Sequence, residues 1–368
     1  MPKWNIHFNH QVDTDDRELI ALHAHIESYR LSIMRIPLPP GKQREFNQIN
    51  MIRQIKGTTG IEGNNLSEDQ IRRVIESGQA NKESEIEAEN AHKTQLFIRN
   101  VVRKLGDDSI YITEDLIRKL HELNTSGLKS NRMNPGKYRT ENVTAGDYTA
   151  PDYTEVPMLM SKFLEVINSN EMIKKITPLI RAVVAHFYLI TIHPFSDGNG
   201  RTSRALEAYI LYSHGYNVRG FYSLANYHYR HRDEYIEQLN KARFIDNGNL
   251  TPFVKYCLRA FLHELEGVQQ SILDYVKLIT FKDYVVEAVK FGEINNRQFN
   301  IMQFLLDGGV LYSEDYRNKR HSYVNQLYNN VTTKTAQRDL KKLIDLKLVI
   351  EYEKRIIPNV HLMDQFVE

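Results

Sequence analysis

One twelve-residue segment concentrates side chains suited to phosphate chemistry: His193-Pro194-Phe195-Ser196-Asp197-Gly198-Asn199-Gly200-Arg201-Thr202-Ser203-Arg204. Proline at position 194 disfavours a helical backbone at the residue before it, so a preceding helix should end at His193. The imidazole is then expected on a loop, near its ordinary pKa of about 6.5, which suits a general base.

The rest of the segment supplies groups that hold phosphates and a metal ion. Gly198-Asn199-Gly200 can present successive backbone N–H groups to an anion at the start of a helix. Arg201 and Arg204 share a face of that helix, where each can clamp a phosphate. Asp197 is a hard oxygen ligand suited to Mg²⁺ that bridges substrate phosphates. Each of these features, taken alone, is more often part of an ordinary loop than of a functional site. Their occurrence together within twelve residues predicts phosphate-ester chemistry.

The segment resembles the signature of Fic-domain proteins, HPFx[D/E]GNGRxxR, and matches all nine specified positions. A weaker resemblance extends over about 113–262. It implies a mostly α-helical fold, with a Fic-type helical core and a small β-hairpin, the flap, at about 139–148. It also implies transfer of AMP from ATP to a Ser, Thr or Tyr hydroxyl of a target protein, with self-modification and a homodimer as further expectations.

The resemblance assigns roles by position. His193 would deprotonate the target hydroxyl, and Asp197 would hold Mg²⁺ on the α- and β-phosphates. ATP would be bound by Gly198, Asn199, Gly200, Arg201, Arg204 and Tyr235, with Arg201 neutralising the leaving pyrophosphate and Phe195 anchoring the loop. Tyr235 would stand alone near the adenine, because Ile236 follows it where family members commonly have a second tyrosine.

A second segment, Thr58-Thr59-Gly60-Ile61-Glu62-Gly63-Asn64, resembles the inhibitory-helix signature [S/T]xxxE[G/N]N of the same family. Its specified residues are Thr58, Glu62 and Asn64. The resemblance implies that Glu62, in the last turn of a helix, pairs with Arg204 and so misplaces the γ-phosphate of ATP. Some family members use this glutamate to position water and remove AMP, so the reverse reaction is also implied.

The remaining pattern is mostly helical and suggests three regions: an N-terminal helical region (1–110), a catalytic core (111–280) and a C-terminal module (290–368). Residues 3–8 alternate between polar and apolar side chains, which predicts a short strand. Residues 143–148 predict a hairpin with its turn at Gly146-Asp147. Helices are expected at about 158–168, 177–192 and 296–306. The charged run Lys82–Asn90 is typical of a solvated helix face, and His186 of a core histidine.

The C-terminal module resembles a winged helix-turn-helix. A helix over 332–343 would bury Ala336, Leu340 and Leu343 and is followed by a β-type hairpin. Residues 317–355 hold ten Lys/Arg and four Asp/Glu, a surplus of +6. One interpretation is that residues 332–355 contact DNA through Gln337, Arg338 and Lys341. The other is that the module serves dimerisation or contacts with another protein.

Composition excludes several classes of protein. The 48 basic and 46 acidic residues of the 368 leave a net charge of +2, unlike a uniformly basic nucleic-acid wrapper. A single cysteine excludes an internal disulfide framework. The sequence has no secretory leader pattern and no apolar run long enough to span a membrane, so a cytoplasmic protein is expected.

Two alternatives to AMP transfer stay open. One is Doc-type phosphoryl transfer, although such relatives depart from the signature at its second glycine, where this chain keeps Gly200. The other is a transcriptional regulator whose Fic-like core senses a nucleotide.

Overall fold

The computed structural model describes residues 8, 11–104, 110–129, 134–217, 220, 224–246 and 248–366. The chain divides into two compact units, residues 1–269 and 270–368, which are described separately. Apart from Phe8, the strand expected over residues 3–8 lies outside the described residues.

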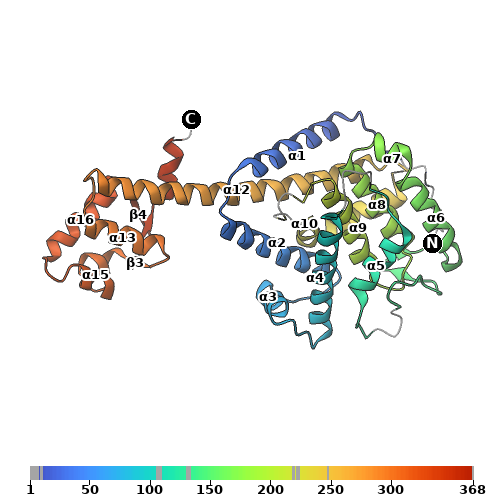
Figure 1. Ribbon diagram of the computed structural model, residues 1–368, viewed down its shortest axis with the longest axis horizontal. Helices are drawn as coiled ribbons and strands as arrows, with labels where there is room; N and C mark the ends of the chain where they lie inside the picture. The colour runs from blue at the N-terminus through green and yellow to red at the C-terminus, as the bar shows by residue number, and fades with distance from the viewer. Residues whose placement is uncertain are drawn as a thin grey trace. The chain divides into compact units, whose positions relative to one another are not determined.

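The first unit is built almost entirely from helices (Figure 1). They are α1 (Arg17–Arg35), α2 (Pro40–Gly60), α3 (Glu68–Ser77), α4 (Glu83–Val102), α5 (Glu114–Thr125), α6 (Val156–Ile167), α7 (Asn170–Lys174), α8 (Pro178–Ile192), α9 (Asn199–Ser213), α10 (Leu224–Arg230) and α11 (Arg232–Phe244), with a 3-10 turn η1 (Tyr153–Glu155). The long helix α12 (Thr251–Lys290) begins in this unit and ends in the second.

Helix α8 is the centre of the first unit. Its sequence is mostly apolar on every face, and every side chain from Leu179 to Ile192 is buried, including those of Arg181 and His186. A helix without a polar face must be surrounded on all sides. Helix α9 packs along it, α6 packs on α8, and α4 and α5 pack on α9. This packing fixes α8 and α9, the two helices on either side of the turn at residues 193–198.

The predicted hairpin is present. Strands β1 (Thr144–Ala145) and β2 (Tyr148–Thr149) pair antiparallel, with Ala145 opposite Tyr148. Gly146 takes a φ of +59° at the turn, a conformation that costs glycine little. The Tyr148 hydroxyl donates a hydrogen bond to the carbonyl of Thr191, which ties the hairpin to the end of α8.

Two segments of the N-terminal region differ from expectation. Helix α2 ends at Gly60, so Glu62 lies in the turn that follows the helix rather than in its last turn. The run Lys82–Asn90, expected to be a solvated face, forms the start of α4, where Ala88 and Asn90 are buried. Asn90 donates to the carbonyl of Ser126, a tertiary contact that a pattern of charges does not reveal.

The second unit combines short helices with one small sheet. It contains α13 (Asn296–Leu306), α14 (Ser313–Arg317), α15 (Ser322–Leu327), α16 (Thr333–Asp345), a 3-10 segment η3 (Val360–Phe366), and strands β3 (Leu311–Tyr312), β4 (Val349–Tyr352) and β5 (Arg355–Pro358), in the antiparallel order β3-β5-β4. Glu353 and Lys354 both have positive φ, as a tight two-residue hairpin turn requires.

The core of this unit follows the predicted pattern. Ala336, Leu340 and Leu343 of α16 are buried, whereas Arg338 and Lys341 on the opposite face are exposed. Across the described parts of both units, no helix combines the length and apolar character needed to cross a bilayer.

Candidate active site

The first half of the signature segment, residues 193–198, forms the turn between α8 and α9, and residues 199–204 begin α9. Helix α8 ends at Ile192 and is capped by His193, as the proline at position 194 predicts. The φ of 52° and ψ of 57° at His193 lie in the left-handed region, which few residues other than glycine adopt. Gly198 has a φ of +77°, and a Cβ there would lie 2.6 Å from Thr125 Cγ2. Glycine is therefore required at this position, both for backbone conformation and for space.

Asn199 and Phe195 make the turn rigid. The Asn199 amide accepts from the Phe195 backbone N–H at 2.9 Å and donates to the Phe195 carbonyl at 2.8 Å. Phe195 is fully buried and stacks on His121, with ring centroids 3.7 Å apart, so it anchors the loop as expected. The Asn199 side chain is used inside the turn, which leaves only its backbone to face an anion.

His121 supports the turn from α5, and sequence reasoning missed it. Its Nδ1 accepts a hydrogen bond from the Gly136 backbone N–H, so Nε2 carries the proton and donates to the Asp197 carbonyl at 2.9 Å. Burial lowers the pKa of His121 to about 4, which keeps the ring neutral in this bridging role. A lone histidine 76 residues from its partner gives no sequence signal.

His193 is held with one ring nitrogen free. Its Nδ1 lies 3.2 Å from the Ile190 carbonyl, which can only accept, so Nδ1 carries the proton and Nε2 keeps its lone pair. The Arg139 guanidinium donates to the His193 carbonyl at 2.9 Å. Burial lowers the pKa of His193 to about 4. The expectation of an ordinary pKa near 6.5 is therefore wrong, because the loop is less solvated than its sequence indicates.

Arg204 meets the inhibitory segment, and the predicted ion pair is present. Arg204 Nη2 lies 2.6 Å from Glu62 Oε1 and donates to the Thr58 carbonyl at 2.9 Å, while Nε donates to Thr58 Oγ1 at 3.1 Å. The arginine side chain is 4% exposed and that of Glu62 34%. Burial raises the pKa of Glu62, but the charge and hydrogen bond of Arg204 outweigh it, so this pKa lies below its ordinary value.

Glu62 also covers the turn itself. A Cβ placed on Gly200 would lie only 2.2 Å from Glu62 Oε1. The carboxylate therefore rests against the Gly200 backbone, at the start of α9 where an anion would be held. Thr58 and Glu62 thus converge on Arg204, whereas Asn64 does not. Asn64 donates to the Ser84 carbonyl at 2.9 Å and to Glu87 Oε2 at 2.8 Å, which ties the turn to α4.

Arg201 points toward α4 instead. Its Nη1 lies 3.1 Å from Glu87 Oε1, and its Nη2 lies 3.7 Å from Asp197 Oδ1. Glu87 was not singled out by sequence reasoning. Asp197 is 54% exposed, and its carboxylate accepts from the Gly198 backbone N–H. In the described parts of the chain no cluster of three or more His, Cys, Asp or Glu could hold a metal, so Asp197 would be a single protein ligand.

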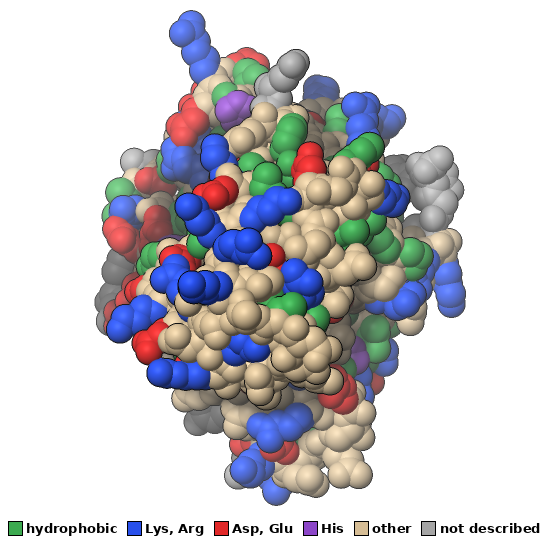
Figure 2. Space-filling view, turned by 90° about the vertical axis from the view of Figure 1, so that its left-hand side faces the viewer, with side chains coloured by type: hydrophobic (Ala, Val, Ile, Leu, Met, Phe, Trp, Pro, Cys, Tyr) green, Lys and Arg blue, Asp and Glu red, His purple; other side chains and the backbone are tan. Residues whose placement is uncertain are grey.

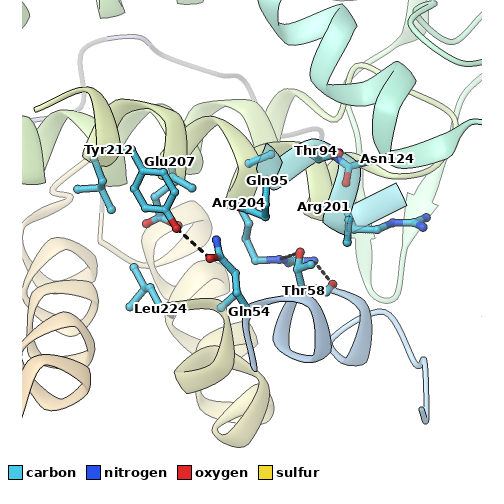
Figure 3. Close-up of a pocket in the computed structure, with 15 residues that line it drawn as sticks. Gln54, Thr58, Thr94, Gln95, Asn124, Arg201, Arg204, Glu207, Tyr212 and Leu224 are labelled. Atoms are coloured by element: carbon cyan, nitrogen blue, oxygen red, sulfur yellow. Dashed lines mark hydrogen bonds between the residues drawn. The ribbon is translucent and has the colours of Figure 1, made fainter. Parts of the chain in front are cut away.

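A cavity of about 500 Å³ joins these groups. It is bounded by the turn, the inhibitory segment, the hairpin and α11, and its lining includes Glu62, Gly146, Tyr148, His193, Gly200, Arg204, Tyr235 and Arg243. A smaller cavity of about 20 Å³ lies beside Arg201 and Arg204 (Figure 3). Arg204 lines both cavities and donates to Thr58, as Figure 3 shows.

Tyr235 takes part in a buried hydrogen-bonded chain. Its hydroxyl lies 2.6 Å from His186 Nε2, and His186 Nδ1 lies 3.0 Å from Glu207 Oε2. Because a carboxylate only accepts, His186 donates to Glu207 and accepts from Tyr235. His186 is a core histidine, as predicted, but its partners were not foreseen. Burial raises the pKa of Tyr235 well above its ordinary value, and the Arg204 charge opposes this rise.

Comparison with known proteins gives a consistent result. Residues 111–211 match the Fic/DOC family. The protein adenylyltransferase Fic of Aedes aegypti is 29% identical over 206 residues, which are 56% of this chain and 39% of that protein. That of Drosophila grimshawi is 27% identical over 250 residues, 66% and 47% of the two chains. The chain thus spans less than half the length of these relatives.

Solved structures share the fold. A Fic family protein from Desulfovibrio desulfuricans G20 has a TM-score of 0.56 at 22% identity, covering 97% of this chain and 98% of that one. Fic-1 (residues 134–508) from C. elegans has a TM-score of 0.57 at 24% identity, covering 70% and 72%. The helical core, the hairpin and the complete signature turn agree with the match of residues 111–211 to the Fic/DOC family, so this chain contains a Fic domain.

Proposed function

We propose that this chain transfers AMP from ATP to a hydroxyl side chain of a target protein and that Glu62 restrains the reaction. One observation carries the proposal: His193, Gly200 and Arg204 face a single cavity beneath the hairpin, and Glu62 occupies Arg204 within it. The name of the relatives, protein adenylyltransferase, agrees with this chemistry.

His193 is the general base of the proposed reaction. Its free Nε2 takes the proton from the target hydroxyl, whose oxygen forms a bond to the α-phosphorus of ATP. The bond between that phosphorus and the bridging oxygen breaks, and pyrophosphate leaves. Because burial lowers the pKa of His193 to about 4, the ring is already deprotonated at neutral pH and available as a base.

The turn and its arginines hold the triphosphate. Backbone N–H groups from Gly198 to Gly200 at the start of α9 favour negative charge. Arg204, once free of Glu62, clamps the γ-phosphate, and Arg201, once free of Glu87, neutralises the leaving pyrophosphate. Asp197 fits Mg²⁺, which takes one or two carboxylates together with substrate phosphates and water. The ion would supply neutralisation of phosphate charge when bound.

The hairpin is the proposed docking edge for the target segment. Gly146 and Tyr148 line the same cavity as His193, so a hydroxyl presented alongside β1 and β2 would reach the imidazole. A serine, threonine or tyrosine hydroxyl meets the chemical requirement equally.

Labelled ATP tests the proposal directly. Glu62→Gly protein incubated with Mg²⁺, a lysate and ATP labelled at the α-phosphorus should produce labelled protein, and ATP labelled at the γ-phosphorus should not. Label from the γ-position alone would replace AMP transfer by phosphoryl transfer. The matched control is His193→Ala in the Glu62→Gly background, which should incorporate neither label. Loss of AMP from labelled target on adding wild-type protein would indicate the reverse reaction.

A second proposed function concerns the C-terminal unit. Lys334, Arg338 and Lys341 of α16 are exposed, and within the described residues none of them takes part in an ion pair. Lys and Arg side chains are spread over the face that includes α16 (Figure 2). We propose nucleic-acid contact through this helix. The affinity for duplex DNA should fall steeply as the salt concentration rises. The double variant Arg338→Gln with Lys341→Gln should show a weaker dependence on salt. Binding that does not depend on salt, or no binding, contradicts the proposal.

A further inference from the structure

A second cavity of about 200 Å³ lies among α2, α3 and α4, and we call it the α2–α3–α4 cavity. Its apolar lining is Met51, Ile52, Ile75 and Leu96, and its polar lining includes Arg72, Arg99 and His92. None of the residues lining it also lines the candidate active site. The cavity thus combines apolar surface with two cationic groups.

The two arginines have no anionic partner within the described parts of the chain. Neither Arg72 nor Arg99 takes part in an ion pair there, and Arg99 Nε is buried without a hydrogen-bond acceptor. Glu76 and Glu89, on the same helices, bond instead to Gln48 and Lys93. A buried cationic donor without an acceptor is unfavourable, so a guanidinium in this position calls for an anion from outside the chain.

Arg99 is also restricted in position. A Cβ on Gly220 would lie 2.9 Å from Arg99 Nη2 and 2.2 Å from Asn47 Oδ1. The Gly220 backbone therefore closes against both side chains at the edge of the cavity. A guanidinium confined in this way loses little conformational freedom when it binds a ligand.

We infer that the α2–α3–α4 cavity binds a small organic anion with an apolar body, a medium-chain or aromatic carboxylate. Its carboxylate would accept hydrogen bonds from Arg99 and Arg72, and its apolar part would lie on Met51, Ile75 and Leu96. A volume of about 200 Å³ lies below the about 300–1,000 Å³ of pockets for drug-sized ligands, so the ligand must be small and a nucleotide triphosphate is excluded.

Binding in this cavity bears on the restraint by Glu62, a step that rests on the proposed function. Helix α2 contributes Met51 and Ile52 to the cavity and, two turns later, Thr58 to Arg204. An anion that bridges α2 to α3 and α4 binds best when α2 is in place, so it favours the state in which Glu62 meets Arg204. The anion would therefore inhibit AMP transfer.

Calorimetric titration of the full chain, without ATP, tests the binding site. Octanoate and benzoate are the probes, and 1-octanol is the neutral control. We expect saturable binding of at least one carboxylate, about tenfold weaker in Arg72→Gln and Arg99→Gln. Arg73→Gln, a change on the exposed face of α3, should bind like the wild type. The inference is overturned if neither carboxylate binds saturably, or if both cavity variants bind as tightly as the wild type. Arg72→Gln keeps the test decisive if Arg99→Gln does not fold.

A labelling assay separates the binding site from its coupling to catalysis. The bound carboxylate should lower AMP transfer by the wild type and leave Glu62→Gly unaffected. Saturable binding with no effect on wild-type transfer would uphold the cavity and overturn the coupling. Absence of any transfer by Glu62→Gly would overturn the proposed function, while the titration would still decide whether the cavity binds an anion.

Discussion

Replacing Glu62 should release AMP transfer, and the structure gives the size of the effect. The carboxylate makes a 2.6 Å charge-assisted hydrogen bond to Arg204. Such bonds contribute about 1.5–3 kcal/mol. Because the Glu62 side chain is 34% exposed, solvent screening favours the lower part of that range, about 1.5–2 kcal/mol. At about 1.4 kcal/mol per factor of ten, Glu62→Gly should raise transfer about 10- to 30-fold.

This figure is a lower bound, because Glu62 also occupies space. Its Oε1 would lie 2.2 Å from a Cβ on Gly200, so a phosphate cannot approach the turn while the carboxylate is there. Glu62→Gln keeps the volume and loses the charge. It should therefore fall between the wild type and Glu62→Gly.

The assay is incorporation of label from α-labelled ATP at saturating Mg²⁺, with circular dichroism to confirm that each variant is folded. The expected order of transfer is Glu62→Gly above Glu62→Gln above wild type, with His193→Ala in the Glu62→Gly background as the blank. If folded Glu62→Gly and wild-type protein incorporate label equally, Glu62 does not restrain the reaction and the reasoning is refuted.

Two further predictions use the same assay. Transfer by Glu62→Gly should be constant between about pH 6 and 8 and should fall only as the pH approaches about 4. Burial lowers the pKa of His193 to about 4, and the imidazole acts as a base only when it is deprotonated. A fall in transfer centred near pH 6.5 would contradict this prediction. Gly57→Ala would place a Cβ 2.5 Å from backbone atoms of Ala225 and Asn226, so it should lower the free energy of unfolding by about 1–3 kcal/mol in chemical denaturation. The displaced α2 should also raise transfer above wild type; unchanged stability and transfer would show that α2 tolerates the methyl group.

Local features of the site were predictable from sequence because neighbouring residues determine them. Proline at 194 fixes the end of α8, and Gly198 is required by the turn before α9. The hairpin at Gly146 and the mostly apolar helix α8 follow from short-range patterns in the same way. The ion pair of Glu62 with Arg204, across 142 residues, was predictable only through the resemblance to a family.

The unpredicted features arise from packing between distant segments. Glu87 reaches Arg201 across 114 residues, and His186 reaches Tyr235 across 49. Neither pair has a spacing that a local pattern encodes. The low pKa of His193 has the same origin, since desolvation depends on what the fold places around the ring.

The position of Glu62 after the end of α2 bears on how the proposed restraint would be released. Arg204 donates two hydrogen bonds to Thr58, which lies within α2, and one to Glu62, which lies in the turn beyond the helix. Rearrangement of the turn alone frees the guanidinium for a phosphate yet keeps it oriented by Thr58, whereas withdrawal of α2 loses all three bonds. We therefore expect Thr58→Val, which removes only the hydroxyl acceptor, to lower transfer several-fold in the Glu62→Gly background, because the buried Nε of Arg204 is left without a partner. If Thr58→Val instead raises wild-type transfer and leaves Glu62→Gly unchanged, Thr58 acts only in the restraint and release requires movement of the whole helix.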